Sequence, residues 1–155
     1  MSTYRIITQK PSTVTFDMAD GTFDLEMEAL GHMDVEIVEV PAKTEDEFIA
    51  AARDADAIIA RGRPITGKII ESLNNCKVIS LGSVGADSVD VAAATAHGIP
   101  VTNVPDTFIE EVADHTMMLL LATFRRLLVQ DRMSRDGSWE QGRPALSQFP
   151  RLMGQ

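Results

Sequence analysis

The sequence predicts an α/β fold built on a parallel five-stranded sheet, and three observations lead to this prediction. Short apolar runs alternate with helix-like segments, which is typical of parallel strands joined by crossover helices. The 155 residues are 45% hydrophobic and 24% charged, the composition of one folded domain. One apolar run, 35–40, alternates with Glu36 and Glu39, as expected of an edge strand with one face in water.

Each expected element has its own signal in the chain. The apolar runs predict strands at 4–8, 35–40, 57–60, 78–81 and 100–104. The first helix, 20–30, has helical apolar spacing and stops at Gly31, a residue suited to a left-handed cap. A capping box from Thr44 to Glu47 starts the second helix, which runs to about Arg53.

The third and fourth helices also begin at capping residues. Thr66 caps a short helix that runs through Leu73, and Asp90 caps an alanine-rich helix that ends at His97 and Gly98. Because the crossovers between parallel strands are right-handed, these elements favour a flavodoxin-like doubly wound sheet in the order 2-1-3-4-5. This order places 35–40 at the exposed edge.

The fifth helix is expected to open with a second capping box, Thr107 to Glu110. Acidic residues near its start and basic residues towards its end follow the order that the helix dipole favours: Glu110, Glu111, Asp114, Arg125 and Arg126. Its middle, 117–122, is apolar on every side, so another surface must cover it. Residues 132–155 are turn-like and polar, either a flexible tail or a linker.

Composition excludes several classes of protein. The formal net charge is −9, with 4 Lys/Arg against 13 Asp/Glu in residues 1–60 and 10 against 10 in residues 61–155, so nucleic-acid binding is disfavoured. The single cysteine, Cys76, cannot form an internal disulfide or a CxxC metal site. No signal peptide and no run of about 18 apolar residues is evident, so we expect a cytoplasmic protein without membrane contact.

A glycine-containing loop, 82–87, follows the fourth strand, at the sheet edge where ligands bind in doubly wound folds. Gly82 and Gly85 permit a tight turn whose backbone N–H groups can hold a carboxylate. A plain strand-to-helix turn that needs glycine for its backbone angles is the interpretation that this pattern alone favours, and the carboxylate site is the alternative. The Gly-x-x-Gly spacing is not that of a GxGxxG phosphate loop.

Few other side chains indicate chemistry. Arg61, after the third strand, could pair with a substrate carboxylate, although an exposed loop arginine is more common. His97 is expected to be structural and His32 solvated, and His115 does not face its neighbour Asp114 on a helix. No cluster has metal-ligand spacing, so no metal is expected.

The segments 78–90, 92–93, 97–101, 103–105 and 111–115 together resemble the D-2-hydroxyacid dehydrogenase family, which includes phosphoglycerate dehydrogenases, glyoxylate reductases and C-terminal binding proteins. The resemblance is dense from about 57 to 135. It implies a substrate domain at 1–105, an interdomain helix at 106–131, and a linker at 132–155 leading to a nucleotide-binding domain, with the chain ending before the GxGxxG loop. The histidine, glutamate and arginine of catalysis would lie in that domain.

The resemblance also implies roles for single residues. Ser83, Val84 and Gly85 match the segment whose N–H groups hold the substrate carboxylate, and Arg61 matches a position that varies with substrate. Val84 and Val112 match positions near the cofactor, NAD or NADP. The family more often has Gly at position 83, where this chain has Ser, and Tyr or Phe at position 86, where it has Ala, which leaves the substrate undefined.

The family's reaction is hydride transfer between the nicotinamide and a small 2-hydroxy or 2-oxo acid. This chain alone is expected to be inactive, to bind no cofactor and to form a homodimer through exposed apolar helix faces, with the fifth helix exchanged between copies as one form. The alternative is a stand-alone module that binds a small carboxylate or a protein partner without catalysis.

Overall fold

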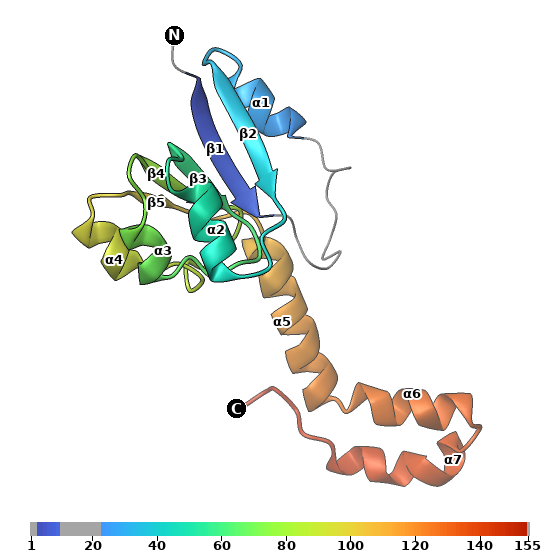
Figure 1. Cartoon of the computed structure of the whole chain (residues 1–155). Coiled ribbons are helices and arrows are strands. Elements are labelled where there is room, and N and C mark those ends of the chain that lie inside the picture. Colours follow the sequence, from blue (N-terminus) through green and yellow to red (C-terminus); the bar gives the residue numbers. More distant parts are fainter. Residues whose placement is uncertain (1–2, 10–22, 155) are drawn as a thin grey trace. The chain divides into compact units, whose positions relative to one another are not determined.

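The computed structural model describes residues 3–9 and 23–154 (Figure 1). The chain divides into two compact units, Met1–Thr107 and Phe108–Gln155. The first unit contains the sheet and its flanking helices, and the second consists of helices. We describe each unit by itself.

The first unit is built on a five-stranded parallel sheet in the order β2-β1-β3-β4-β5. The strands are β1 (Tyr4–Gln9), β2 (Val35–Val40), β3 (Ala57–Ala60), β4 (Val78–Leu81) and β5 (Val101–Thr102). This topology confirms the predicted fold. β2 lies at the edge of the sheet, as predicted, and Glu36 and Glu39 are both exposed. The prediction of a single face in water is wrong, because residues three positions apart on a strand point to opposite faces.

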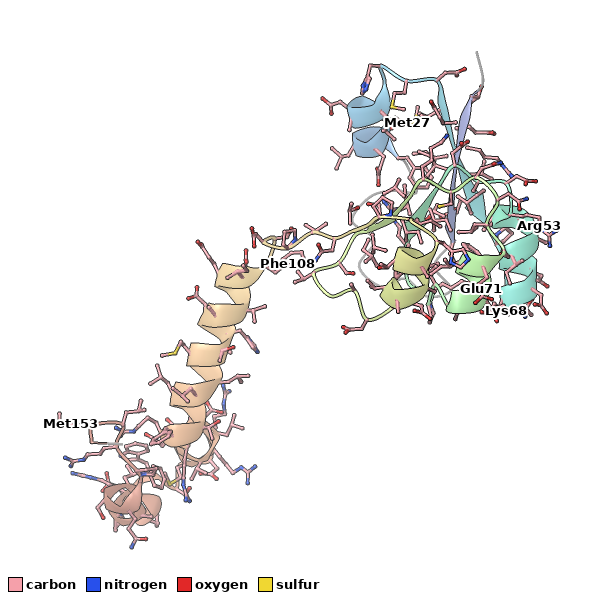
Figure 2. All side chains as sticks on the ribbon, turned by 90° about the vertical axis from the view of Figure 1, so that its left-hand side faces the viewer. Met27, Arg53, Lys68, Glu71, Phe108 and Met153 are labelled. Atoms are coloured by element: carbon pink, nitrogen blue, oxygen red, sulfur yellow. The ribbon has the colours of Figure 1, made fainter. Side chains whose placement is uncertain are left out.

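Four helices flank this sheet: α1 (Asp24–Leu30), α2 (Glu45–Ala52), α3 (Gly67–Glu71) and α4 (Val91–Ala96). Figure 1 shows α2, α3 and α4 together and α1 apart from them. In the turned view of Figure 2, Met27 of α1 likewise lies away from Arg53 and from Glu71 of α3. Residues 20–22, which the sequence assigned to the first helix, lie outside the described residues.

The core forms on one face of the central strands, where alternate residues of β3 and β4 are buried and neighbouring strands present paired side chains. Ile7, Ile58 and Ile79 of the three middle strands are fully buried, and Phe48 of α2 is 1% exposed. Such burial of aliphatic and aromatic side chains is the main stabilising contribution in a domain of this size. The core therefore fixes the strands whose ends carry the candidate site.

Three of the predicted helix caps are confirmed. Thr44 and Glu47 form the full capping box at α2, and the side chains of Thr66 and Asp90 accept backbone N–H groups at α3 and α4. The left-handed cap at Gly31 is wrong, because Gly31 has a helical φ of −62°. Gly98 instead has a φ of +68° after α4, where glycine avoids the cost of a β-carbon.

The second unit contains α5 (Ile109–Phe124), α6 (Leu127–Arg135), α7 (Trp139–Gly142) and the 3-10 helix η1 (Arg143–Gln148). The capping box predicted at Thr107 is wrong, since Phe108 precedes the first turn of α5 without a side-chain cap. The prediction of one unbroken helix through 131 is also wrong. Arg126 has a φ of +48°, so a new helix starts at Leu127.

Contacts within the second unit explain this break. The guanidinium of Arg126 lies 5.3 Å from the ring centroid of Phe149, and the Gln130 amide donates to the carbonyl of Arg125. Met133 is 9% exposed and lies so close to Gly142 that a β-carbon there would overlap its sulfur. The segment after 132, expected to be turn-like, is therefore partly helical and folds back on α6.

A polar cluster lies at the amino ends of β1, β3 and β4. Asp56 accepts the Lys77 ammonium at 2.8 Å and the backbone N–H of Arg5 at 3.0 Å, and Lys77 lies 4.6 Å from the Tyr4 ring centroid. The Lys77 hydrogen bond, followed by the Arg5 N–H, lowers the pKa of Asp56. A lowered native pKa stabilises the fold above the ordinary carboxyl range, and this contribution is lost as the pH falls through the native pKa.

Replacing Asp56 with asparagine should therefore make the free energy of unfolding depend less on pH in the acid range. We expect the free energy of unfolding to fall less between about pH 5 and pH 2.5 in D56N than in the wild type. Urea unfolding at both pH values measures this difference. Asp106→Asn is the control, because Asp106 is exposed and its carboxylate forms no hydrogen bond or ion pair with the described residues. An equal reduction of the pH dependence in that variant would contradict the assignment.

Candidate carboxylate-binding site

The loop from Gly82 to Asp87 begins directly after β4, at the carboxyl edge of the sheet. Ser83, Val84 and Gly85 are all exposed, with Val84 at 46%. Ile79 and Leu81 of β4 are buried in the core, so the loop extends from a fixed strand into solvent. The structure therefore places three of the four predicted substrate-binding residues together on an accessible loop, and the fourth, Arg61, follows β3.

The backbone carbonyl groups of Ser83, Val84 and Gly85 all accept hydrogen bonds. The N–H of Val104 donates to Ser83 O at 3.1 Å, and the Asn103 side-chain amide donates to Val84 O at 2.7 Å. The Ser83 hydroxyl donates to Gly85 O at 2.8 Å. The loop is thus held through its oxygen atoms by the segment that follows β5 and by its own serine.

The N–H groups of the same three residues are free. Across residues 3–9 and 23–154, no acceptor is bonded to the N–H of Ser83, Val84 or Gly85. Exposed N–H groups without protein acceptors on consecutive residues are donors that an anion can use. The arrangement, with the oxygens occupied and the donors open, fits binding of a carboxylate.

Asn103 is a residue of this site that the sequence analysis did not single out. β5 is shorter than predicted, because Asn103 and Val104 leave the sheet to bond to the loop after β4. Neighbouring parallel strands end at the same edge, so a polar residue after one strand can support the loop after the next. The place of Asn103 after the fifth predicted strand was therefore the signal in the sequence that could have identified it as part of the site.

Arg61 lies at the same edge but is already engaged. Its guanidinium pairs with Glu26 of α1 and lies 5.4 Å from the ring centroid of Phe23. The next arginine, Arg63, donates to Gln9 Oε1 at 2.9 Å and to Ala42 O at 3.0 Å. The structure therefore gives Arg61 an acidic protein partner that the sequence did not reveal.

The remaining candidates have structural contacts or belong to the second unit. His97 Nδ1 is 2.9 Å from Ala93 O at the end of α4, as expected of a structural histidine. Val112, in the first turn of α5, belongs to the second unit and is 62% exposed.

In the part of the chain that the structure describes, no group of His, Cys, Asp or Glu could hold a metal ion. None of the described helices combines the length and apolarity that crossing a bilayer requires.

The fold and this edge loop define an α/β domain with a glycine-containing turn at the carboxyl edge of its parallel sheet. A family model described as "D-isomer specific 2-hydroxyacid dehydrogenase, catalytic domain" matches residues 17–148. Since this match covers most of the chain, the chain belongs to that family.

Individual relatives agree with the family. D-3-phosphoglycerate dehydrogenase of Mycobacterium tuberculosis is 33% identical over 124 residues, 79% of this chain and 23% of the relative. Glyoxylate reductase of Thermococcus gammatolerans is 35% identical over 114 residues, 70% of this chain and 33% of the relative. The solved structure of an acyclic imino acid reductase in complex with NADPH and D-Arg has a TM-score of 0.64 and 25% identity, covering 86% of this chain and 41% of that one. The chain thus spans about a quarter to a third of the length of the curated relatives.

Proposed function

We propose that this chain is the substrate domain of an NAD(P)-dependent D-2-hydroxyacid dehydrogenase, which transfers a hydride between nicotinamide and a 2-hydroxy or 2-oxo acid. The observation that supports this most is the loop at Ser83 to Gly85, with its carbonyls bonded and its N–H groups open. The family match covers this loop. In this proposal the N–H groups bind and orient the substrate carboxylate.

Orientation is the contribution that this chain would make to the reaction. Two or three N–H donors fix a carboxylate in one plane, which places the neighbouring C2 atom in a defined position. A loop bonded through its carbonyls needs little reorganisation when the anion arrives, so the donors act at low entropic cost. Asn103 is a positioning residue in this scheme, because it acts through the Val84 carbonyl.

The residues present fit only a small part of a dinucleotide. Bound NAD(P) would supply the hydride acceptor or donor. Val84, in the first unit, and Val112, in the second unit, each have an exposed apolar side chain, and we propose each of them separately as a residue that contacts the cofactor. The 155 residues contain no GxGxxG sequence, and we propose that a nucleotide-binding domain holds the pyrophosphate. We also propose a cytoplasmic location, in keeping with the single free thiol of Cys76.

A turnover assay tests the proposal that this chain binds substrate while a separate domain binds the dinucleotide. With NADH or NADPH and glyoxylate, pyruvate or hydroxypyruvate, we expect no oxidation of the cofactor by the 155-residue chain, because the described part offers substrate-binding groups without a dinucleotide loop. Glyoxylate reductase of Thermococcus gammatolerans, assayed in parallel, is the positive control. Turnover by the pure chain would contradict the proposal. Binding of 2-oxo acids without turnover in any reconstituted form would favour the carboxylate-binding module instead.

We further propose that isolated copies of this chain form a homodimer through α5. Five consecutive apolar residues, Met117 to Leu121, are between 42% and 54% exposed and cover the whole circumference of the helix. Glu110 and Glu111 lie in the first turn of α5, and Arg125 follows its last residue. Antiparallel pairing of two such helices sets the acidic end of each against the basic end of the other.

Light scattering measures this association. We expect a mass twice the 16.9 kDa of the chain, and a shift towards the monomer when Leu121 is replaced by arginine, because a charge then enters the paired face. Leu25→Arg, on the separate helix α1, is the control and should leave the mass unchanged. A monomer at high concentration in the wild type would contradict the proposed pairing.

A further inference from the structure

Both arginines that follow β3 are held by protein groups. Arg63 donates to Gln9 Oε1 and Ala42 O and lies 5.6 Å from the Phe48 ring centroid, which fixes it to the fold. Arg61 pairs with Glu26, and its guanidinium lies over Phe23 at the start of α1. The pair is accessible, with side-chain exposures of 41% for Arg61 and 28% for Glu26.

The register of the sheet places Arg61 beside the carboxylate loop. Ala60 of β3 and Leu81 of β4 are paired neighbours in the parallel ladder. Arg61 is the next residue after the first, and Gly82 is the next residue after the second. Adjacent strands lie about 4.8 Å apart, so the backbone of Arg61 starts alongside the loop that the proposed function assigns to the substrate carboxylate.

The relatives named above differ in the chemistry of their substrates. One is a dehydrogenase of a phosphoglycerate, which carries a phosphate besides its carboxylate, and the other reduces glyoxylate, whose only charge is its carboxylate. A second anionic group requires a free cation near the carboxylate loop. In this chain the charge of Arg61 is cancelled by Glu26, and a phosphate bound there would meet the Glu26 carboxylate as well.

We infer that Glu26 sets the substrate class of this site: by occupying Arg61, it favours small 2-oxo acids with a single negative charge over phosphorylated ones. The inference rests on the proposed function, because it concerns the substrate bound at Ser83 to Gly85. Glu26 and Phe23 are positioning residues in it. They hold Arg61 as a neutral pair beside the loop.

Binding of two probes to the folded chain tests the inference. Oxamate carries one carboxylate and a neutral amide, whereas phosphoglycolate carries a carboxylate and a phosphate. Amide NMR titrations at constant ionic strength give both dissociation constants. In Glu26→Gln we expect phosphoglycolate to bind about fivefold more tightly than in the wild type, the effect of one unbalanced charge at a solvated site. Oxamate affinity should change less than twofold.

Two further variants isolate the pair. Glu28→Gln removes the same charge from the same helix, and Glu28 has no ion pair among the described residues, so both affinities should stay at the wild-type values. Glu26→Gln combined with Arg61→Gln should return phosphoglycolate binding to the wild-type level, because the freed cation is gone. Circular dichroism of each variant verifies its fold.

The outcomes separate this inference from the proposed function. If oxamate moves the amides of Ser83 to Gly85 but Glu26→Gln leaves the ratio of the two affinities unchanged, the role of Glu26 is wrong and the carboxylate site stands. An equal effect of Glu28→Gln would show a general charge effect and overturn the inference in the same way. If oxamate fails to bind the wild type, the proposed function is wrong and this inference falls with it.

Discussion

Replacing Asn103 with alanine is expected to weaken oxamate binding about three- to tenfold. The Asn103 amide donates to Val84 O at 2.7 Å and ties the carboxylate loop to the segment after β5. A hydrogen bond of this kind contributes about 0.5–1.5 kcal/mol net. Without it the loop must order itself when the anion binds, and that cost appears in the dissociation constant. NMR titration of the variant measures the change.

Asn74→Ala is a matched control for this prediction. The Asn74 amide also donates a 2.7 Å hydrogen bond, in this case to Asp54, and it is exposed as Asn103 is. It lies after α3, away from the carboxyl edge of the sheet. The control should bind oxamate as the wild type does. Equal losses in both variants would assign the effect to general destabilisation and would remove Asn103 from the site.

Replacing Phe48 with alanine is expected to lower the free energy of unfolding by about 3–5 kcal/mol, because a buried ring is lost and the cavity collapses only in part. Phe48 is 1% exposed on α2, among the fully buried residues of the core, and the Arg63 guanidinium lies 5.6 Å from its ring centroid. Domains of this size are stable by only about 5–15 kcal/mol. Urea unfolding followed by circular dichroism measures the loss.

Leu25→Ala removes a large apolar side chain that is 78% exposed on α1. We expect its free energy of unfolding to stay within about 0.5 kcal/mol of the wild type. A loss in Leu25→Ala comparable to that in Phe48→Ala would contradict the position of the core. A loss below about 1 kcal/mol in Phe48→Ala would do the same.

The sheet could be predicted because its signals are local. The bounds of β3 and β4 equal those of the apolar runs 57–60 and 78–81, and the two glutamates at 36 and 39 distinguish the edge strand from these buried runs. The cap at Thr44 involves partners three residues apart. Right-handed crossovers then leave few sheet orders to consider.

The errors occur where distant contacts decide the local conformation. Arg126 adopts a positive φ, which is uncommon outside glycine and asparagine, and its contact with Phe149 comes from 23 positions further along the chain. Residues Thr107 to Glu110 have the sequence of a capping box, but a helix cap contributes only about 1 kcal/mol of stability, so other contacts can override it. The chain before α5 follows another path, with Phe108 at the cap position.

In the candidate site too, local features could be predicted from the sequence and contacts between distant residues could not. The loop of Ser83 to Gly85 was identified from its glycines and its place after a strand. The occupation of its carbonyls by Asn103 and Val104 depends on a neighbouring strand, and the pairing of Arg61 with Glu26 joins residues 35 positions apart. Side-chain contacts at such separations leave no periodic signal in the sequence.

The amide spectrum of the 155-residue chain, recorded during a titration with oxamate, tests the carboxylate site most directly. We predict that the resonances of Ser83, Val84 and Gly85 shift furthest and saturate together with a single dissociation constant, since no residue in the described part of the chain accepts a hydrogen bond from their N–H groups. Oxamate that leaves these three resonances in place, whether it shifts others or none, would contradict the assignment of this loop as the substrate carboxylate site.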